Sequence, residues 1–328
     1  MNTRLRAIDT RTLSPAKRRY AGIAPFTFAA YSNAHEEHPE RNEDTMLVER
    51  RRGLAAVFDG VGGVDGGDDA SQLAARVIRR AWKRALQQQQ PDRNASLLML
   101  RGDLDIQALL HQLLDEAQSA LSDEGERRAK AASITDGNVS YPETTAVVAA
   151  LCQCPDQSDW QPEKKGYIMG YAHIGDSRIY LLRPGESLQR LTLDDGYSTK
   201  KIHDHTISEE DALRIDQTTR AEQLTETERE IFDKRYGITQ SLGHLNPKQT
   251  SITIHTAQTM IFPGDRVLLC SDGIHDNLTD AEIEAIIRGR ARTTVARHLV
   301  QHALERSRET HLRAKKDDMS AIVITCNL

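Results

Sequence analysis

The sequence predicts an α+β fold of four α-β-β-α layers, in which two mainly antiparallel sheets are flanked by helices. Two observations predict this fold. Short strand-like runs, several of them β-branched, lie between two groups of amphipathic helices. Their order also lacks the regular alternation of strand and helix that builds a parallel sheet. Antiparallel sheets covered by helices on their outer faces accommodate both observations.

A hairpin is the first element predicted, from apolar runs at 45–48 and 54–58 that a charged turn separates. Two amphipathic helices follow, and their apolar residues recur at three- and four-residue spacing. Near the C-terminus Thr279 and Glu282 have the spacing of a capping box, which predicts that a helix starts there. Another helix is predicted around 295–304. Further strands are predicted at 144–151, 167–173, 178–182, 251–256, 266–270 and 321–325.

The chain of 328 residues is predicted to form one main domain. Residues 1–24 are read as a basic N-terminal arm and residues 25–328 as a single catalytic domain. Residues at about 194–240 are polar and charged, with little strand signal and two helical hints. We expect them to form an inserted flap.

Composition excludes several classes of protein. The net charge of -5 and the pI near 6.2 give no general attraction to nucleic acid or to an anionic membrane surface. The basic N-terminus lacks the apolar core of a secretory signal, and no later segment has the composition of a membrane span. The four cysteines form no Cys-x-x-Cys pair, so disulfides are not expected. A cytoplasmic location without nucleic-acid or membrane partners is predicted.

Four acidic stretches carry the chemical signal. Two follow apolar strand-like runs directly and one precedes another such run, so they can converge at one end of a sheet. Carboxylate and carbonyl oxygens are the ligands that Mg²⁺ and Mn²⁺ prefer, and the sequence has no His or Cys cluster of the kind that binds zinc. The stretches are Asn42-Glu43-Asp44, Asp59-Gly60-Val61-Gly62-Gly63, Ser271-Asp272-Gly273 and Asp317-Asp318-Met319-Ser320.

Two more motifs complete an ordered set of six: Thr144-Thr145-Ala146 and Gly175-Asp176-Ser177-Arg178. Each is weak alone, because Asp-Gly pairs are common in turns. In this order and spacing they resemble the metal-dependent protein phosphatase (PPM) family, the phosphatase 2C-like serine/threonine phosphatases. The resemblance covers roughly residues 25–328.

The resemblance implies a site with two Mn²⁺ or Mg²⁺ ions bridged by Asp59. The Gly60 carbonyl, Asp272 and Asp317 would complete the inner ligands, and Asp44 would lie in or near this shell. Asp176, together with Asp272, would bind a weaker third ion. The implied reaction is hydrolysis of phosphoserine and phosphothreonine in proteins by in-line attack of a metal-bridging hydroxide, without a phosphoenzyme.

The sequence departs from the family pattern at the phosphate-binding arginine, whose usual position is occupied by Pro39. Arg41 is the nearest replacement, since a guanidinium fork suits phosphate oxygens. His35 and His38 lie in the same loop and remain alternatives. The usual glycine before the Thr-Thr-Ala motif is Glu143.

Two other functions stay open at this stage. A catalytically weak relative that binds phosphoproteins would explain the displaced arginine, and a small-metabolite phosphatase could use the same metal site. No Cys-x5-Arg phosphate loop is present, which excludes that class of phosphatase. An opposing serine/threonine kinase is a partner by family resemblance.

Overall fold

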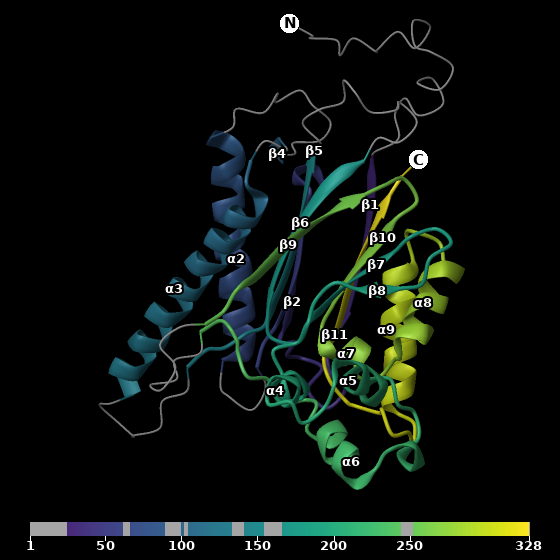
Figure 1. Cartoon of the computed structure of the whole chain (residues 1–328). Helices are drawn as coiled ribbons and strands as arrows, with labels where there is room; N and C mark the ends of the chain where they lie inside the picture. The colour runs from purple at the N-terminus through teal and green to yellow at the C-terminus, as the bar shows by residue number, and fades with distance from the viewer. Residues whose placement is uncertain are drawn as a thin grey trace, which may run out of the picture.

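The computed structural model describes residues 25–61, 66–88, 100–101, 104–132, 141–153, 166–243 and 252–327. Two β-sheets lie face to face between two pairs of helices. One pair is α2 (Gly67–Gln88) and α3 (Ile106–Ala132), and the other is α8 (Asp280–Gly289) and α9 (Val295–Ser307). Figure 1 shows the four layers side by side. The predicted α-β-β-α sandwich is confirmed.

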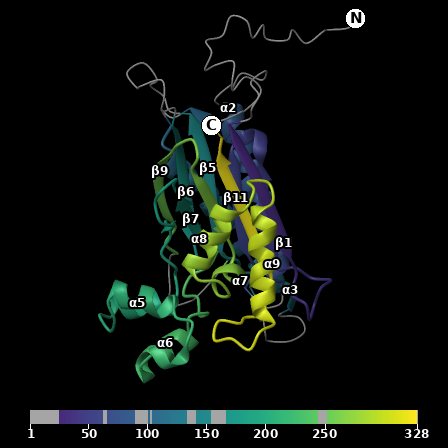
Figure 2. The ribbon, with the colours of Figure 1, turned by 90° about the vertical axis from the view of Figure 1, so that its right-hand side faces the viewer.

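The first sheet contains both ends of the domain. Its order is β1-β11-β10-β7-β8, and each neighbouring pair is antiparallel. Helix α9 packs on β1 and β11, as Figure 2 shows from the side of α8 and α9. The strands are β1 (Phe26–Asn33), β11 (Met319–Cys326), β10 (Arg266–Cys270), β7 (Arg178–Leu182) and β8 (Gln189–Arg190).

The second sheet has the order β2-β3-β5-β6-β9, again antiparallel throughout. A short strand, β4, pairs with β5 in parallel. The predicted hairpin is confirmed as β2 and β3, with Arg50–Arg52 forming a 3-10 turn between them. The strands are β2 (Asp44–Glu49), β3 (Leu54–Asp59), β5 (Ala146–Gln153), β6 (Tyr167–Ile174), β9 (His255–Ile261) and β4 (Leu100–Arg101).

Burial on both faces explains why β3 is apolar without alternation. Leu54, Ala56 and Phe58 point to the core beneath α2 and α3. Ala55 and Val57 point to the core between the sheets. Successive side chains of a strand face opposite sides, and here each side is covered, so both sides require apolar residues.

A buried tryptophan and a capping box help to position the helices. Trp82 of α2 is fully buried, and its indole N–H donates to the Arg52 carbonyl (3.0 Å). The capping box of Thr279 and Glu282 is confirmed at the start of α8. No described helix is long and apolar enough to cross a lipid bilayer.

The segment at about 194–240 is helical. It contains α4 (Tyr197–His203), α5 (Glu209–Asp216), a 3-10 turn (Ala221–Gln223) and α6 (Glu226–Asp233). Capping boxes begin both α5 and α6, and these two helices match the two helical hints of the sequence analysis. Figures 1 and 2 show α5 and α6 beyond one end of the sheets, near the short helix α7 (Asp272–His275). That this segment acts as a flap stays a prediction.

Some predicted elements were wrong or missed. The bounds of the strand predicted at 251–256 are wrong, because pairing with β6 begins only at His255, opposite His173, and β9 continues to Ile261. Strands β1, β4 and β8 were not predicted, nor was α7. The predicted basic arm, residues 1–24, lies outside the described residues. Cys152, Cys270 and Cys326 are free and buried, and Cys154 also lies outside the described residues.

Candidate metal centre and active site

Four aspartates come together because of where their strands begin and end. Asp44 opens β2 and pairs in register with Asp59, the last residue of β3. Asp272 follows β10 by two residues, and Asp317 precedes β11 by two. Neighbouring antiparallel strands bring the end of one beside the start of the next. Ser271, which follows β10 of the first sheet, donates to Asp44 Oδ2 of the second (2.7 Å). Asp44 and Asp59 of one sheet therefore lie at the same end of the sandwich as Asp272 and Asp317 of the other.

A cavity of about 230 Å³ opens at this end. Asp59, Asp272 and Asp317 line it, together with Asp176 from the turn between β6 and β7. Tyr236, which follows α6, forms part of the opposite wall. The candidate site residues that the sequence selected are thus adjacent in space.

The two Asp-Gly motifs need glycine for close backbone contact. A Cβ on Gly60 would lie 2.4 Å from the carbonyl carbon and oxygen of Gly67, and a Cβ on Gly273 would lie 2.0 Å from the Asp318 carbonyl oxygen. Both distances are below any tolerable contact. Glycine therefore lets the chain turn tightly next to Asp59 and Asp272.

The Thr-Thr-Ala motif fixes the backbone of Asp59. The Thr144 hydroxyl and the Thr145 backbone N–H both donate to the Asp59 carbonyl (2.8 Å each). Thr145 also exchanges a hydrogen bond with Ser177 of the Gly-Asp-Ser-Arg motif (2.8 Å). Asp59 is thereby connected to the turn that carries Asp176.

The Asn42-Glu43-Asp44 motif sets the position of Asp44. The Asn42 side chain accepts from the Asp44 backbone N–H (2.9 Å) and donates to Ser32 of β1 (2.9 Å). Ser271 holds one oxygen of the Asp44 carboxylate, whereas the other, Oδ1, is buried without a hydrogen-bond partner. That oxygen is available to a bound ion or to its water.

The neighbouring aspartates 317 and 318 differ in what they bind. Asp318 accepts the backbone N–H of His35 at Oδ1 and that of Glu43 at Oδ2, both at 2.6 Å. Its carboxylate therefore fixes the loop before β2. Asp317 instead faces Lys315, with its Oδ2 2.8 Å from the Lys315 Nζ. The Asp317 Oδ1 accepts the Asp318 backbone N–H (2.8 Å). That Asp317 is the ligand, as the resemblance implies, stays a prediction.

Burial and crowding change the acidity of the cluster. Burial raises the pKa of Asp44, Asp59 and Asp176 well above the usual range, and neighbouring carboxylates raise it further. Burial also raises the pKa of Asp272, although Lys315 opposes that shift. Carboxylates this crowded need nearby cations to stay ionised.

The donor chemistry fits hard divalent cations. Asp272 Oδ1, like Asp44 Oδ1, is buried without a hydrogen-bond partner. Carboxylate and carbonyl oxygens are what Mg²⁺ and Mn²⁺ prefer. Across the described ranges, no three His, Cys, Asp or Glu side chains are arranged to enclose an ion as they stand.

Comparison with known proteins decides the family. A sequence profile described as protein phosphatase 2C matches residues 32–314. The chain belongs to this family. The enzyme class predicted from the sequence, a metal-dependent serine/threonine protein phosphatase of the PPM type, is thus confirmed at the level of the family.

Individual relatives of this phosphatase 2C chain are distant. A putative protein phosphatase 2C-type of Streptococcus pyogenes is 31% identical over 117 residues, which cover 36% of this chain and 39% of that protein. The serine/threonine phosphatase stp of Listeria innocua is 23% identical over 253 residues, 77% of this chain and 79% of that protein. The chain therefore spans about two fifths of the first relative and four fifths of the second.

A solved structure agrees with the fold. The catalytic domain of the serine/threonine phosphatase PstP, in complex with two manganese ions, superposes with a TM-score of 0.59. The two are 22% identical, over 92% of this chain and 99% of that one. Likeness at this level of identity shows the fold.

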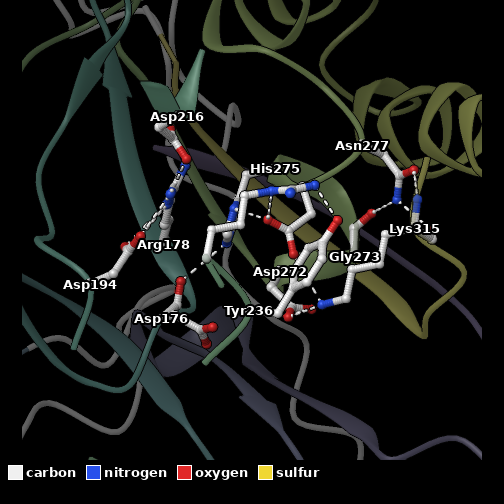
Figure 3. A network of polar contacts seen from close by, with 12 residues as sticks. Asp176, Arg178, Asp194, Asp216, Tyr236, Asp272, Gly273, His275, Asn277 and Lys315 are labelled. Carbon is white, nitrogen blue, oxygen red and sulfur yellow. Dashed lines mark hydrogen bonds and ion pairs between the residues drawn. The ribbon is translucent and has the colours of Figure 1, made fainter. Parts of the chain in front are cut away.

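Two charged residues in the phosphatase 2C site were missed by the sequence analysis. The Lys315 ammonium contacts the carboxylates of Asp272, Asp276 (3.0 Å) and Asp317 (2.8 Å), as Figure 3 shows for the labelled residues. Asp276 is also buried, one helical turn after Asp272. The four-residue spacing was a usable signal for Asp276, since such residues lie on one helix face.

Arg41 lies beside the cavity. Its guanidinium binds Glu43 (2.6 Å), which lines the cavity, and lies 3.5 Å from Asp68 at the start of α2. The Arg41 side chain is 40% exposed, so it can reach a bound anion. His35 is buried with its Nε2 unpartnered, and its ring lies 4.6 Å from the His38 ring, centroid to centroid, with the ring planes tilted by 39°.

A larger cavity, of about 570 Å³, lies next to the metal centre. Asp176 lines both cavities, and the helical segment 194–240 forms much of the larger one. Leu193 and Leu213, 48% and 51% exposed, lie in its wall with Glu209 and Glu210. The larger cavity is therefore a groove with exposed apolar and acidic residues in its wall, and it adjoins the aspartate-lined cavity at Asp176.

Proposed function

We propose that this chain is a Mn²⁺- or Mg²⁺-dependent phosphatase that hydrolyses phosphoserine and phosphothreonine in proteins. One observation carries the proposal: Asp44, Asp59, Asp272 and Asp317 gather at one end of the sandwich, where Asp44 and Asp272 each keep a buried oxygen without a partner. This arrangement suits a centre of two divalent ions.

Asp59 would bridge the two ions, and the Gly60 carbonyl, Asp272 and Asp317 would complete the protein ligands. The manganese pair in PstP, a protein of the same fold, supports this assignment. When bound, two such ions lower the pKa of a coordinated water and neutralise charge on a transferring phosphoryl group.

The protein residues would orient the reaction. Ser271 fixes Asp44 so that its second oxygen can accept a hydrogen bond from the attacking water. Arg41, held beside the cavity by Glu43, would bind phosphate oxygens with its guanidinium. Burial raises the pKa of Cys152 and Cys326 to about 12 and also raises that of Cys270. These described cysteines are therefore poor nucleophiles, which favours direct attack by water.

The groove beside the metal centre favours a protein substrate. Exposed Leu193 and Leu213 can contact apolar side chains next to a phosphorylated residue, and Glu209 and Glu210 can pair with basic ones. A serine/threonine kinase that forms the same phosphoproteins would be the opposing enzyme. The cytoplasmic location stays a prediction.

The two alternatives have less support. A binding protein without catalysis would explain why Pro39 replaces the usual arginine, but the metal-ligand aspartates are all present. A phosphatase for small metabolites would not need the groove.

Substrate class is tested by comparing a phosphothreonine peptide with p-nitrophenyl phosphate and with small phosphorylated metabolites. If the groove binds the peptide, Leu193→Ala with Leu213→Ala raises the KM for the peptide roughly three- to tenfold and leaves p-nitrophenyl phosphate unchanged. Leu104→Ala, an exposed leucine (37%) that is not part of the groove wall, is the matched control. Faster turnover of a metabolite than of any peptide would contradict the assignment.

A further inference from the structure

Lys315 places a positive charge inside the acidic cluster. Its Nζ contacts the Asp272 carboxylate and lies 3.0 Å from Asp276 and 2.8 Å from Asp317. The Tyr236 ring covers it, with the ring centroid 4.6 Å from Nζ. Only 17% of the lysine side chain is exposed. Three carboxylates and an aromatic face therefore surround one ammonium group. Figure 3 shows Asp272 and Tyr236 next to Lys315.

The backbone of Lys315 is clamped to the turn that carries Asp272. The Lys315 N–H donates to the Asn277 side-chain oxygen (3.0 Å), and the Asn277 amide donates to the Lys315 carbonyl (2.9 Å). The same amide donates to the Gly273 carbonyl (2.9 Å). The lysine, Asp272 and Asp276 thus belong to one hydrogen-bonded unit, so the ammonium position is built into the fold.

The next residue shows that this placement is specific. Lys316 is 56% exposed, and its ammonium binds Glu37 at the surface (2.7 Å). Two adjacent lysines therefore differ completely in environment, and only Lys315 enters the cavity wall.

We propose that the Lys315 ammonium takes the place of the third, weaker divalent ion, so that this chain binds two metal ions and supplies the third positive charge itself. The inference rests on the proposed function, because it concerns the same metal centre. By the family resemblance, Asp272 and Asp176 are the two residues that would bind the third ion. Lys315 contacts Asp272, and Asp176 lines the same cavity as Lys315.

Charge explains why the lysine would exclude the ion. The Lys315 Nζ contacts Asp272 Oδ2. A divalent ion bound to this oxygen would lie next to the ammonium, and two positive charges so close together repel strongly in a partly buried site. The lysine also compensates Asp276, which has no role among the predicted ligands. A covalently attached cation remains in place at any metal concentration.

Counting bound Mn²⁺ tests the proposal without reference to activity. Equilibrium dialysis against increasing Mn²⁺, with bound metal measured by atomic absorption, gives the number of ions per chain. We expect two for the wild type up to millimolar Mn²⁺. Lys315→Met keeps an unbranched side chain that is one atom shorter, removes the charge, and should bind a third ion. Lys316→Met should bind two, as the wild type does.

The outcomes separate this inference from the proposed function. Three ions on the wild type, or two ions on a folded Lys315→Met protein, would overturn the role of Lys315 and leave the phosphatase assignment intact. No bound Mn²⁺ on the wild type would overturn the metal centre itself. Circular dichroism shows whether the Lys315→Met protein is folded. If the variant is unfolded, the number of ions bound by the wild type still tests the proposal, because three ions would contradict it.

Discussion

Ser271 donates a hydrogen bond of 2.7 Å to Asp44, and this bond connects the two sheets at the metal centre. Ser271 follows β10 of one sheet, and Asp44 begins β2 of the other. The Ser271 hydroxyl also accepts the backbone N–H of Ser320 at the start of β11 (3.0 Å). One small side chain thereby aligns three strand ends around the proposed ions.

Ser271→Ala removes this link without removing a ligand. Asp44 would lose its hydrogen bond from the other sheet and hold its water less precisely. We expect Mn²⁺ affinity or turnover to fall about 10- to 100-fold, the usual effect of losing a partner of a metal-site carboxylate. Isothermal titration with Mn²⁺ measures the affinity. Ser271→Thr keeps the hydroxyl and is the control, and an alanine variant with wild-type affinity and turnover would show that Asp44 needs no such partner.

Arg41→Ala tests the proposed phosphate contact. Loss of a charged hydrogen bond to phosphate should raise the KM for a phosphopeptide roughly tenfold, with a smaller change in kcat. Arg229→Ala, an exposed arginine on α6 that pairs with Asp233, is the control and should change neither constant. Unchanged kinetics in Arg41→Ala would direct attention to His35 and His38.

Arg178 is predicted to stabilise the attachment of the 194–240 segment. Its side chain is 4% exposed and binds Asp194 (2.7 Å) and Asp216 (3.0 Å). Arg178→Met leaves both carboxylates with only the more distant Arg190 (3.4 and 3.9 Å) and should lower the free energy of unfolding by about 3 kcal/mol. Arg229→Met, which breaks an exposed pair, should cost less than about 1 kcal/mol. Urea unfolding measures both, and equal effects would contradict a structural role for Arg178.

His173 should make the stability depend on pH. Burial, with a contribution from His255, lowers the pKa of His173 to about 4 from an ordinary 6.5. Between these two pH values the unfolded chain binds more protons than the folded chain. The contribution of His173 to the free energy of unfolding is therefore complete above pH 6.5 and is lost as the pH falls towards 4. It amounts to about 3 kcal/mol.

His173→Phe keeps a ring against His255, which stacks on it at 4.7 Å, but cannot be protonated. The free energy of unfolding of this variant should fall less between pH 6.5 and pH 4 than that of the wild type. An identical pH dependence in both proteins would show that another group is responsible.

The sequence predicted the site better than its surroundings, for physical reasons. Each site motif is a short run of residues, so its resemblance to a known family could be seen in the sequence, although the contacts of the motifs, such as that of Thr144 with Asp59, join distant segments. Lys315 was missed because its position depends on Asn277, which is far away in the sequence. Strand β1 was missed because its partner β11 lies at the other end of the chain. The phosphate-binding role of Arg41 stays a prediction, with His35 and His38 as alternatives, since this loop differs from the family pattern.

The central claim is tested most directly by measuring phosphate release from a phosphothreonine peptide with added Mn²⁺, added Mg²⁺ or EDTA, for the wild type and for Asp59→Asn. We expect release with a divalent ion, none with EDTA, and a loss of at least about 100-fold in the variant, because the bridging carboxylate is gone. Release in EDTA, or wild-type rates in a folded Asp59→Asn protein, would contradict the metal centre.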